Sequence, residues 1–326
     1  MPDKVSISAC PDYQQDNVDQ SVKQIFDHFG GIRKFVSPGQ RVLLKPNMIC
    51  PDPPEKLSTT HPAVVAAVTK LVREAGGIPF IGDIPVIGSA RRVAKASGIL
   101  AACQHLGAEI VELGTYCPSN NHQDPHYGQL GSARQVFQAD VIINLPKLKA
   151  HEQILLTLGV KNMFGGVSLP RRVWRHIQAG DGALEFSRMV LSTYLMVPPA
   201  FTLIDGIIAM ETKGPRGGTA KPLGILAGGC NAVAVDRVIV EALSLPWREL
   251  PVLAIAQEMG VSGWDFEQIE LCGTPLEQVQ VSDFKFPRLV PVQFAIWRSL
   301  KIVARQTWKK LAASKSNSAP RQPSPE

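Results

Sequence analysis

Short apolar runs alternate with longer amphipathic stretches along this chain. The runs that have the length and composition of buried strands are 41–45, 78–81, 108–113, 140–145, 201–204, 223–227 and 269–271. The stretches with apolar residues at helical spacing are 16–29, 62–75, 89–106, 169–197 and 233–243. Because such alternation is typical of βαβ units, the pattern predicts an α/β fold with a mostly parallel sheet and helices on both faces.

Capping and turn-forming residues predict where these elements begin and end. Asp16 suits the N-cap of the first helix. Pro62 fits the first turn of the second helix, which the threonines before it would cap. We expect the strand at 201–204 to end at Asp205, and the polar segment 120–131 to be a surface loop.

Length and composition are those of a globular α/β protein. The chain has 326 residues, of which 45% are hydrophobic and 19% are charged. We expect residues 1–283 to form a single α/β domain with a helical cap at 165–200. The six cysteines show no C-x-x-C pair, which disfavours a zinc ribbon or an intrinsic iron–sulfur cluster. Without a secretion signal or an apolar run of 18 residues, the sequence predicts a cytoplasmic protein.

Positive charge is concentrated at the C-terminal end of the chain. Residues 284–326 contain nine lysines and arginines and one glutamate, whereas the other residues contain 25 basic and 27 acidic side chains. Since the main body has no basic excess, nucleic-acid binding is not expected there. The segment 291–311 predicts a basic amphipathic helix with Trp297 and Trp308, and a disordered tail follows it. This helix would either lie on an anionic membrane surface or pack against protein.

Polar side chains follow several of the predicted strands at the point where each strand ends. They are Lys45, Asn47, Asp83, Lys147, Lys149, His151 and Asp205. The carboxyl ends of parallel strands meet at one edge of the sheet, where ligands bind in open α/β folds. A buried lysine needs an anion or a carboxylate beside it. The pattern therefore predicts either a pocket for a small anionic ligand or a structural network of ion pairs.

Three histidines are candidates for a role at this edge. His151 follows the second pair of lysines and could act as a general base or as a hydrogen-bonding group. His61 precedes the helix start at 62, where an anion or a helix cap is expected. His176 belongs to the basic run 171–176, which fits either a site or a solvated helix face.

Two other groups of side chains have metal-binding chemistry. Asp83 and Asp205 would either orient the lysines or bind a divalent metal. The second group is Cys117, His122, Asp124 and His126. Its spacing matches no standard zinc signature, so we do not expect a metal there.

An ordered set of motifs resembles domain-of-unknown-function family 362. The motifs are LLKPN, TTHP, GD-x-P, LPKLKAHEQ, LGVKNMFGG, LIDGI-x-AMETKGP-x-GG and AVAVD. The resemblance implies a cytoplasmic α/β protein. Many proteins of that family carry an attached ferredoxin-like module, which is absent from this chain. Asn231-Ala232 also stands where the family usually has Asp-Pro.

The resemblance implies a set of candidate site residues without assigning their roles. They are Lys45, Asn47, His61, Asp83, Lys147, Lys149, His151, Lys161, Asn162, His176, Asp205 and Glu211.

Two functions are compatible with these residues. In the first, the chain is an enzyme of a redox pathway that acts on a small anionic ligand. Lys147, Lys149 and Lys161 would then hold the anion, and His151 or His176 would transfer protons. Lys147 is also a candidate catalytic group. In the second, the chain is a non-catalytic docking protein for a separate ferredoxin-like protein, located in the cytoplasm or at the membrane surface.

Overall fold

The fold is built on one large mixed sheet. The computed structural model describes residues 2–120, 124–127, 129–180 and 182–291, and within these residues ten strands form this sheet. Its main path runs β12–β1–β11–β10–β7–β2–β3–β4, while β8 pairs with β10 and β9. The antiparallel pairs are β1 with β11, β10 with β11 and β8 with β9, and the other pairs are parallel. The predicted α/β fold with a mostly parallel sheet is confirmed.

The strands of this sheet have lengths from three to eleven residues. They are β1 (Asp3–Ala9), β2 (Arg41–Pro46), β3 (Ile78–Asp83), β4 (Glu109–Glu112), β7 (Val141–Leu145), β8 (Lys147–His151), β9 (Leu155–Thr157), β10 (Phe201–Glu211), β11 (Thr219–Gly229) and β12 (Ile269–Gly273).

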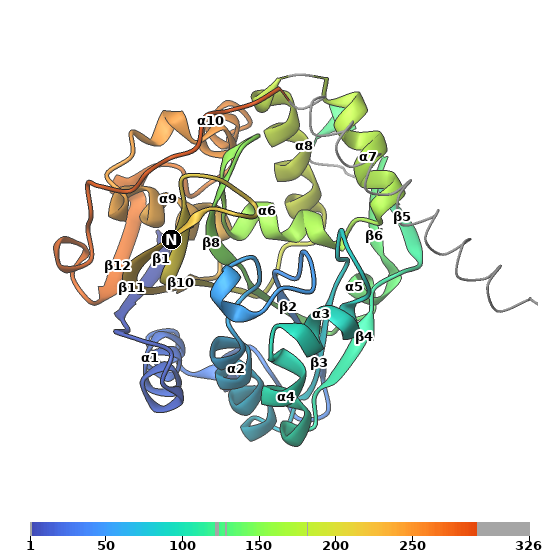
Figure 1. Ribbon diagram of the computed structural model, residues 1–326, viewed down its shortest axis with the longest axis vertical. Coiled ribbons are helices and arrows are strands. Elements are labelled where there is room, and N and C mark those ends of the chain that lie inside the picture. Colours follow the sequence, from blue (N-terminus) through green and yellow to red (C-terminus); the bar gives the residue numbers. More distant parts are fainter. Residues whose placement is uncertain (1, 121–123, 128, 181, 292–326) are drawn as a thin grey trace, which may run out of the picture.

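Helices cover both faces of the sheet (Figure 1). Among the described residues they are α1 (Gln15–Asp27), α2 (Pro62–Glu74), α3 (Ala90–Ala96), α4 (Ile99–Cys103), α5 (Arg134–Phe137), α6 (Gly159–Met163), α7 (Leu169–Gln178), α8 (Ala183–Met196), α9 (Ala232–Ala242) and α10 (Pro251–Glu258). The apolar side chains of α1 to α4 form one core, and those of α6 and α8 to α10 form another. In β2, Leu43 belongs to the second core and Leu44 to the first, because successive strand residues point to opposite faces.

Several helix boundaries differ from the predicted ones because of local backbone conformation and capping. The expected helix at 89–106 is divided into α3 and α4 by Gly98, whose positive φ of 81° interrupts the helical backbone. Asp16 is not the N-cap of α1, since Gln14 occupies that position and Asp16 lies in the first turn. The cap of α2 is also not a threonine, because His61 Nδ1 accepts a hydrogen bond from the amide of Ala63.

Pairing between strands that are distant in the chain explains the larger differences between the predicted and the observed elements. The strand predicted at 201–204 continues through Asp205 to Glu211, because β11 pairs with it along most of its length. The two ends of the expected surface loop 120–131 belong instead to strands that pair with each other, β5 (Tyr116–Asn120) and β6 (Gln129–Ala133). The strands β1, β8 and β9 and the helix α10 were not predicted from the sequence.

Two further helical segments are predicted in the second half of the chain, at 165–200 and 291–311. Residues 165–200, where a helical cap is predicted, contain α7 and α8. The predicted amphipathic helix at 291–311 and the tail after it lie outside the described residues, apart from residue 291. None of the helices in the described part of the chain has the length and apolar character needed to cross a membrane.

Candidate functional site

Two lysines at strand ends form ion pairs inside the protein. Lys45 Nζ lies 2.8 Å from Asp83 Oδ1, and Lys147 Nζ lies 2.9 Å from Asp205 Oδ1. All four side chains are almost completely buried. Burial lowers the pKa of both lysines, and the paired carboxylates counteract part of this effect. The alternative of a structural ion-pair network therefore describes these two lysines.

Tyr13 and His61 contact the Lys147–Asp205 ion pair. Tyr13 donates its hydroxyl proton to Asp205 Oδ1 at 2.7 Å and accepts a hydrogen bond from Lys147 Nζ at 2.6 Å. The Tyr13 ring stacks on His61 with centroids 3.6 Å apart. The amide of His61 donates to Asp205 Oδ2 at 2.9 Å. The carboxylate thus has partners on both oxygens, and it holds the start of α2 against β10.

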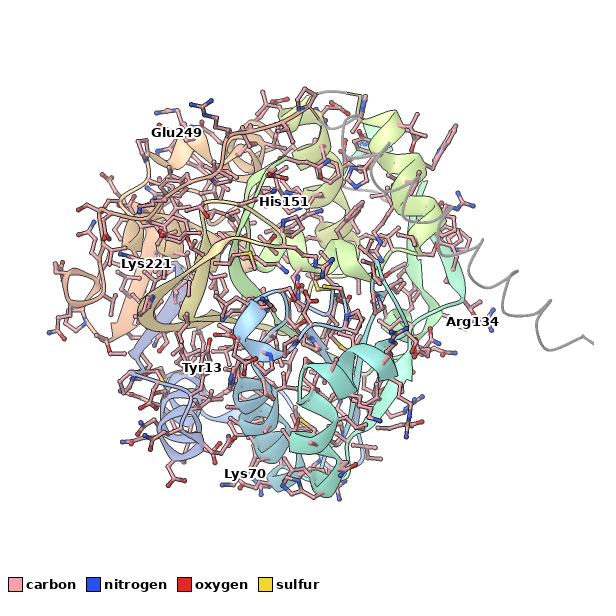
Figure 2. The ribbon with its side chains drawn as sticks, viewed as in Figure 1. Tyr13, Lys70, Arg134, His151, Lys221 and Glu249 are labelled. Atoms are coloured by element: carbon pink, nitrogen blue, oxygen red, sulfur yellow. The ribbon has the colours of Figure 1, made fainter. Side chains whose placement is uncertain are left out.

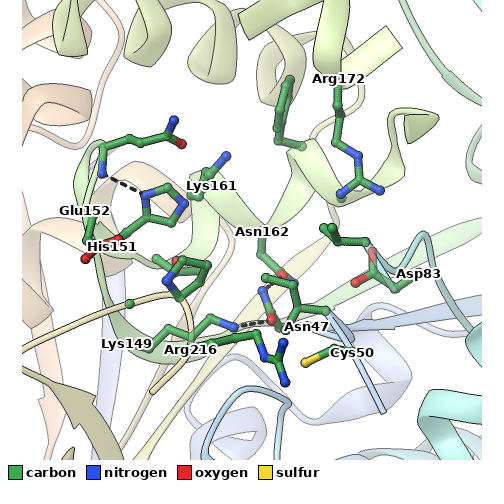
Figure 3. Close-up of a pocket in the computed structure, with 18 of the residues that line it drawn as sticks. Asn47, Cys50, Asp83, Lys149, His151, Glu152, Lys161, Asn162, Arg172 and Arg216 are labelled. Atoms are coloured by element: carbon green, nitrogen blue, oxygen red, sulfur yellow. Dashed lines mark hydrogen bonds between the residues drawn. The ribbon is translucent and has the colours of Figure 1, made fainter. Parts of the chain in front are cut away.

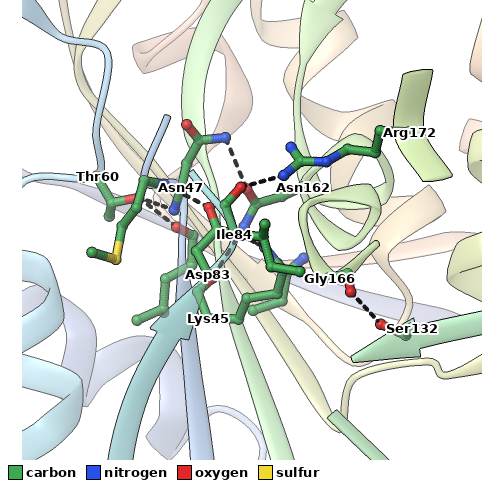
Figure 4. A network of polar contacts seen from close by, with 12 residues as sticks. Lys45, Asn47, Thr60, Asp83, Ile84, Ser132, Asn162, Gly166 and Arg172 are labelled. Atoms are coloured by element: carbon green, nitrogen blue, oxygen red, sulfur yellow. Dashed lines mark hydrogen bonds and ion pairs between the residues drawn. The ribbon is translucent and has the colours of Figure 1, made fainter. Parts of the chain in front are cut away.

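Three asparagines connect the strand ends to α6 (Figure 4). Asn162 donates to Asn144 Oδ1 at 2.9 Å and to the carbonyl of Lys45 at 3.1 Å. Its own oxygen accepts a hydrogen bond from Asn47 Nδ2 at 2.9 Å. Asn47 Oδ1 then accepts from Lys149 Nζ at 2.6 Å. Because each amide has a defined partner, the network fixes the position of Lys149 relative to α6.

A cavity of about 370 Å³ lies beside this network (Figure 3). The basic side chains that line it are Lys149, His151, Lys161, Arg172, His176, Lys213 and Arg216. The acidic side chains that line it are Asp83 and Glu152. In the wider view, His151 lies toward the middle of the molecule, whereas Lys70 and Glu249 lie at its periphery (Figure 2). Positive charge exceeds negative charge around the cavity.

Lys161 is only partly buried, whereas Lys45, Lys147 and Lys149 are fully buried, and its surroundings also differ from theirs. Its ammonium group lies 4.4 Å from the ring centroid of Phe164 and 4.5 Å from that of Phe186. Among the described residues, no oxygen accepts a hydrogen bond from it and no carboxylate forms an ion pair with it. Burial lowers the pKa of Lys161 well below its usual range, and the charges of Arg172 and Lys149 lower it further.

Lys149 is held by neutral oxygens. Its Nζ donates to Asn47 Oδ1 and to the carbonyl of Ser58, both at 2.6 Å. Because burial is not offset by an ion pair, the pKa of Lys149 falls to about 7. The two acceptors use two of its protons and leave the third direction of the nitrogen available.

Two histidines of the cavity are neutral near pH 7. Burial lowers the pKa of His151 well below its usual range and that of His176 to about 3, and nearby Lys161 adds to both effects. His151 Nδ1 accepts a hydrogen bond from the amide of Gln153 at 3.2 Å, which assigns the proton to Nε2. His176 stacks on Phe186, and its buried Nδ1 has no hydrogen-bond partner within the described part of the chain.

Arg172 and Arg216 bring guanidinium groups to the cavity from distant segments. Arg172 extends from α7 and donates to the carbonyl of Ile84, while its Nε has no partner among the described residues. Arg216 forms a bidentate ion pair with Asp52, with nitrogen–oxygen distances of 2.9 and 3.1 Å. Arg172 therefore contributes an uncompensated charge to the cavity, whereas the charge of Arg216 is balanced.

Buried contacts position α6, the helix that carries Lys161. Asp236 accepts hydrogen bonds from the amides of Gly159 at 2.6 Å and Val160 at 3.1 Å, at the start of this helix. Burial raises the pKa of Asp236 to about 8. At the other end, Gly165 packs so closely that a Cβ would lie 2.4 Å from Asp83 Oδ1. The AVAVD and MFGG motifs thus fix the helix at both ends.

The structure divides the candidate residues into two groups. Those that line the cavity are Asn47, Asp83, Lys149, His151, Lys161, Asn162 and His176. Those outside its lining are Lys45, His61, Lys147, Asp205 and Glu211. Glu211 accepts a hydrogen bond from the amide of Lys285 at 2.8 Å and holds that segment against β10. Lys147 is in the ion pair with Asp205, so a ligand in the cavity would not contact it.

Several residues of the site were not singled out by the sequence. They are Tyr13, Asn144, Arg172, Arg216 and Asp236. The sequence could have indicated Arg172 as a site residue, because it stands four residues before His176 and shares one side of α7 with it. No pattern in the sequence indicates Tyr13, since its partner Asp205 is distant in the chain and only the fold brings the two residues together.

The metal-capable side chains are already engaged in other contacts. Asp83 accepts from Lys45 and from the amide of Met48, so both of its oxygens have partners. Asp124 accepts from Arg188 and Ser192, and His126 lies 2.9 Å from Glu185. His122 lies outside the described residues. In the described part of the chain, no three His, Cys, Asp or Glu side chains are grouped as metal ligands.

The cysteines do not fit an iron–sulfur cluster. All six are free and lie on separate segments of the fold: Cys10, Cys50, Cys103, Cys117, Cys230 and Cys272. A cluster needs cysteine thiolates that converge on one point. Cys50, which lines the cavity, donates to Asp52 instead, and burial raises its pKa to about 11.

Fold and site together define an α/β protein with a cation-lined cavity beside the carboxyl ends of its parallel strands. The chain belongs to the family described as Domain of unknown function (DUF362), which matches residues 42–241. A thylakoid-associated protein of Synechocystis sp. is 38% identical over 304 residues, which are 92% of this chain and 93% of that protein. The family resemblance seen in the motifs is thereby confirmed.

Two solved structures are similar over part of the chain. One is the lactate racemase apoprotein of Thermoanaerobacterium thermosaccharolyticum, with a TM-score of 0.44, 13% identity and 71% of this chain covered. The other is a protein of Thermotoga maritima, with a TM-score of 0.40, 10% identity and 66% of this chain covered. The chain spans 54% and 55% of their lengths.

Proposed function

We propose that this protein binds a small anionic ligand in the cavity between α6, α7 and the ends of β2 and β8. The observation that supports this proposal is the presence of three basic side chains, Lys149, Lys161 and Arg172, without an ion-paired carboxylate among the described residues. Uncompensated charge inside a protein is costly, and an anion between these groups would offset that cost. Of the two carboxylates in the lining, Asp83 is already engaged with Lys45.

The chemistry of the lining favours a carboxylate or a phosphate. A guanidinium group binds two oxygens of such an anion in parallel, and lysine supplies a compact positive charge. His151 adds a neutral N–H donor at Nε2. The cavity volume of about 370 Å³ lies within the range of small-molecule sites. His151 and His176 would accept protons from such a ligand if binding is followed by a reaction.

Replacing Arg172 with glutamine is expected to weaken anion binding by about tenfold to a hundredfold, because charge-assisted hydrogen bonds contribute about 1.5–3 kcal/mol. Binding would be measured by calorimetry and thermal shift with phosphate, oxalate, citrate and phosphoenolpyruvate. Arg171→Gln is the matched control, since Arg171 is the neighbouring residue and lies over Tyr116 outside the cavity lining. Equal affinities of the two variants, or no binding of any of these anions to the unmodified protein, would contradict the proposal.

A second function is supported by three exposed apolar side chains on α7 and at the start of α8. We infer that these side chains bind the surface of an anionic membrane. Trp174, Ile177 and Leu184 are 54%, 50% and 54% exposed, and the exposed Arg171 lies beside them in the chain. Exposed aromatic and aliphatic side chains near arginine are typical of interfacial binding. The thylakoid association of the Synechocystis relative supports the same inference.

The triple variant with serine at positions 174, 177 and 184 is expected to reduce binding to anionic vesicles by about tenfold, because each replaced side chain contributes buried apolar area. Flotation with phosphatidylglycerol vesicles measures this effect. Ile78→Ser is the matched control, since Ile78 is 49% exposed at the start of β3. Unchanged flotation of the triple variant, together with its loss on deletion of residues 292–326, would assign membrane binding to the tail instead.

A further inference from the structure

We propose that Lys161 is an amine nucleophile that forms an imine with the carbonyl carbon of a small oxo anion, such as a 2-oxo acid, held in the cavity. This inference rests on the proposed anion binding and names the class of ligand. A 2-oxo acid has the two features that this cavity would recognise. Its carboxylate suits Arg172 and Lys149, and its carbonyl group suits a free amine.

The first support is the hydrogen bonding of four lysines, of which three are buried and Lys161 is partly buried. Lys45 donates to Asp83, Lys147 to Tyr13, and Lys149 to Asn47 and the Ser58 carbonyl. Lys161 has no such acceptor in the described part of the chain and is enclosed by Phe164 and Phe186. Its amine is therefore the one among these four whose nitrogen is not held by protein oxygens.

The second support is the electrostatic environment of this amine. An imine forms only from the neutral amine, which carries the lone pair. The aromatic rings favour the ammonium form, but burial and the charge of Arg172 oppose it and prevail. A lysine in an apolar site beside another cation is a recognised way to obtain an amine nucleophile at neutral pH.

The third support is the presence of unpartnered polar atoms in the same lining. Thr157 Oγ1 and His176 Nδ1 are buried and have no hydrogen-bond partner among the described residues. Both residues are on the cavity wall, as Lys161 is. A buried polar atom without a partner costs free energy, and a carbonyl or hydroxyl oxygen of a ligand would satisfy it. These atoms thus point to a polar ligand.

The reaction balances without a redox partner. The lone pair of Lys161 Nζ attacks the carbonyl carbon, and a proton moves from nitrogen to oxygen to give a carbinolamine. The hydroxyl group then takes the second proton of the nitrogen, the carbon–oxygen bond breaks, water leaves, and a carbon–nitrogen double bond forms. His151 and His176 are neutral groups of the same cavity and would carry these protons.

The full-length protein would be incubated with pyruvate, glyoxylate or 2-oxoglutarate and then reduced with cyanoborohydride. Peptide mass spectrometry is expected to find the reduced adduct at Lys161, at least tenfold above exposed Lys56, because an ordinary lysine is neutral in only about one molecule in 2,500 at pH 7. Lys161→Arg should abolish this adduct, and Lys56→Arg should leave it unchanged.

A second measurement does not depend on the choice of oxo acid. In competitive labelling with trace acetic anhydride at pH 7, Lys161 is expected to react at least tenfold faster than Lys56. Absence of the adduct and slow labelling of Lys161 would overturn the inference. If oxalate and phosphate still raise Tm in that case, anion binding stands without imine chemistry, whereas no response to any anion would overturn both.

Discussion

Replacing Asp205 with alanine is expected to lower the free energy of unfolding by about 3–5 kcal/mol, because it leaves Lys147 buried without a counter-charge. The Lys147–Asp205 pair is 1% and 0% exposed, so water cannot replace the carboxylate. The substitution also removes the acceptor of the Tyr13 hydroxyl and of the His61 amide. This loss is a large part of the stability of a typical domain.

Urea denaturation followed by circular dichroism would measure this change. Asp27→Ala is the matched control, since Asp27 forms the exposed i,i+4 pair with Lys23 and should change stability by at most about 0.5 kcal/mol. In the double variant Lys147→Met/Asp205→Leu, the protein should recover part of the stability, because no buried charge is left without a partner. A loss in Asp205→Ala no larger than that in Asp27→Ala would show that the pair does not stabilise the fold.

The rule that ligands bind at the carboxyl ends of parallel strands predicted the region of the site. It did not show which lysines form ion pairs and which line the cavity. Lys147, Lys149 and His151 stand two residues apart on β8, which places them on the same side of the strand. Yet Lys147 is paired with Asp205, whereas the other two line the cavity. The difference comes from Asp205 on β10 and Tyr13 after β1, whose positions depend on the sheet order. A sequence pattern contains no information on such pairs.

The spacing of residues along α7 could have predicted a helix with two different sides. The run 171–176 was compatible with a solvated basic face. In the structure, Arg172 and His176 face the cavity, while Trp174 is exposed on the other side. An i, i+4 pair of arginine and histidine, with an aromatic residue between them, would have indicated a helix with two functional sides. Only the fold shows which side is covered.

The strand β1 was not predicted from the sequence, although its apolar and polar residues alternate. Val5 and Ile7 are buried in the core on one face of the sheet, and Ser6 and Ser8 are buried on the other face, against α1 and the residue after it. Ser6 bonds to His28, and Ser8 donates to Gln24, so the serines are satisfied inside the fold. Burial of polar residues by tertiary partners cannot be read from periodicity alone.

Lowering the pH from 6.5 to 5 is expected to reduce the free energy of unfolding by up to about 2 kcal/mol for each of three histidines with a lowered pKa, His61, His151 and His176. Burial lowers the pKa of His61 to about 4 and of His176 to about 3, and it lowers the pKa of His151 well below its usual range. In this window the unfolded chain binds protons that the folded chain does not bind. Acid therefore favours unfolding, and the stabilising effect is complete only above the unfolded pKa of about 6.5.

Urea denaturation at pH 7.5, 6.5 and 5 would measure this dependence in the unmodified protein and in His176→Gln. We expect the loss between pH 6.5 and 5 to be smaller by about 2 kcal/mol in the variant, because one of the three groups no longer titrates. His105→Gln is the matched control, since His105 is exposed and distant from the cavity lining. Identical pH profiles for all three proteins would contradict the assignment of His176 as a buried neutral group.

The same profiles also test the proposed ligand class. Protonation of Lys149, whose pKa is about 7, adds positive charge to the cavity between pH 7.5 and pH 5. An anion that binds the folded state stabilises it by mass action, and this effect should grow as the cavity becomes more positive. The acid-induced loss should therefore be smaller in phosphate than in chloride at equal ionic strength. In Arg172→Gln this difference between the two salts should decrease, because the proposed guanidinium contact to the anion is absent.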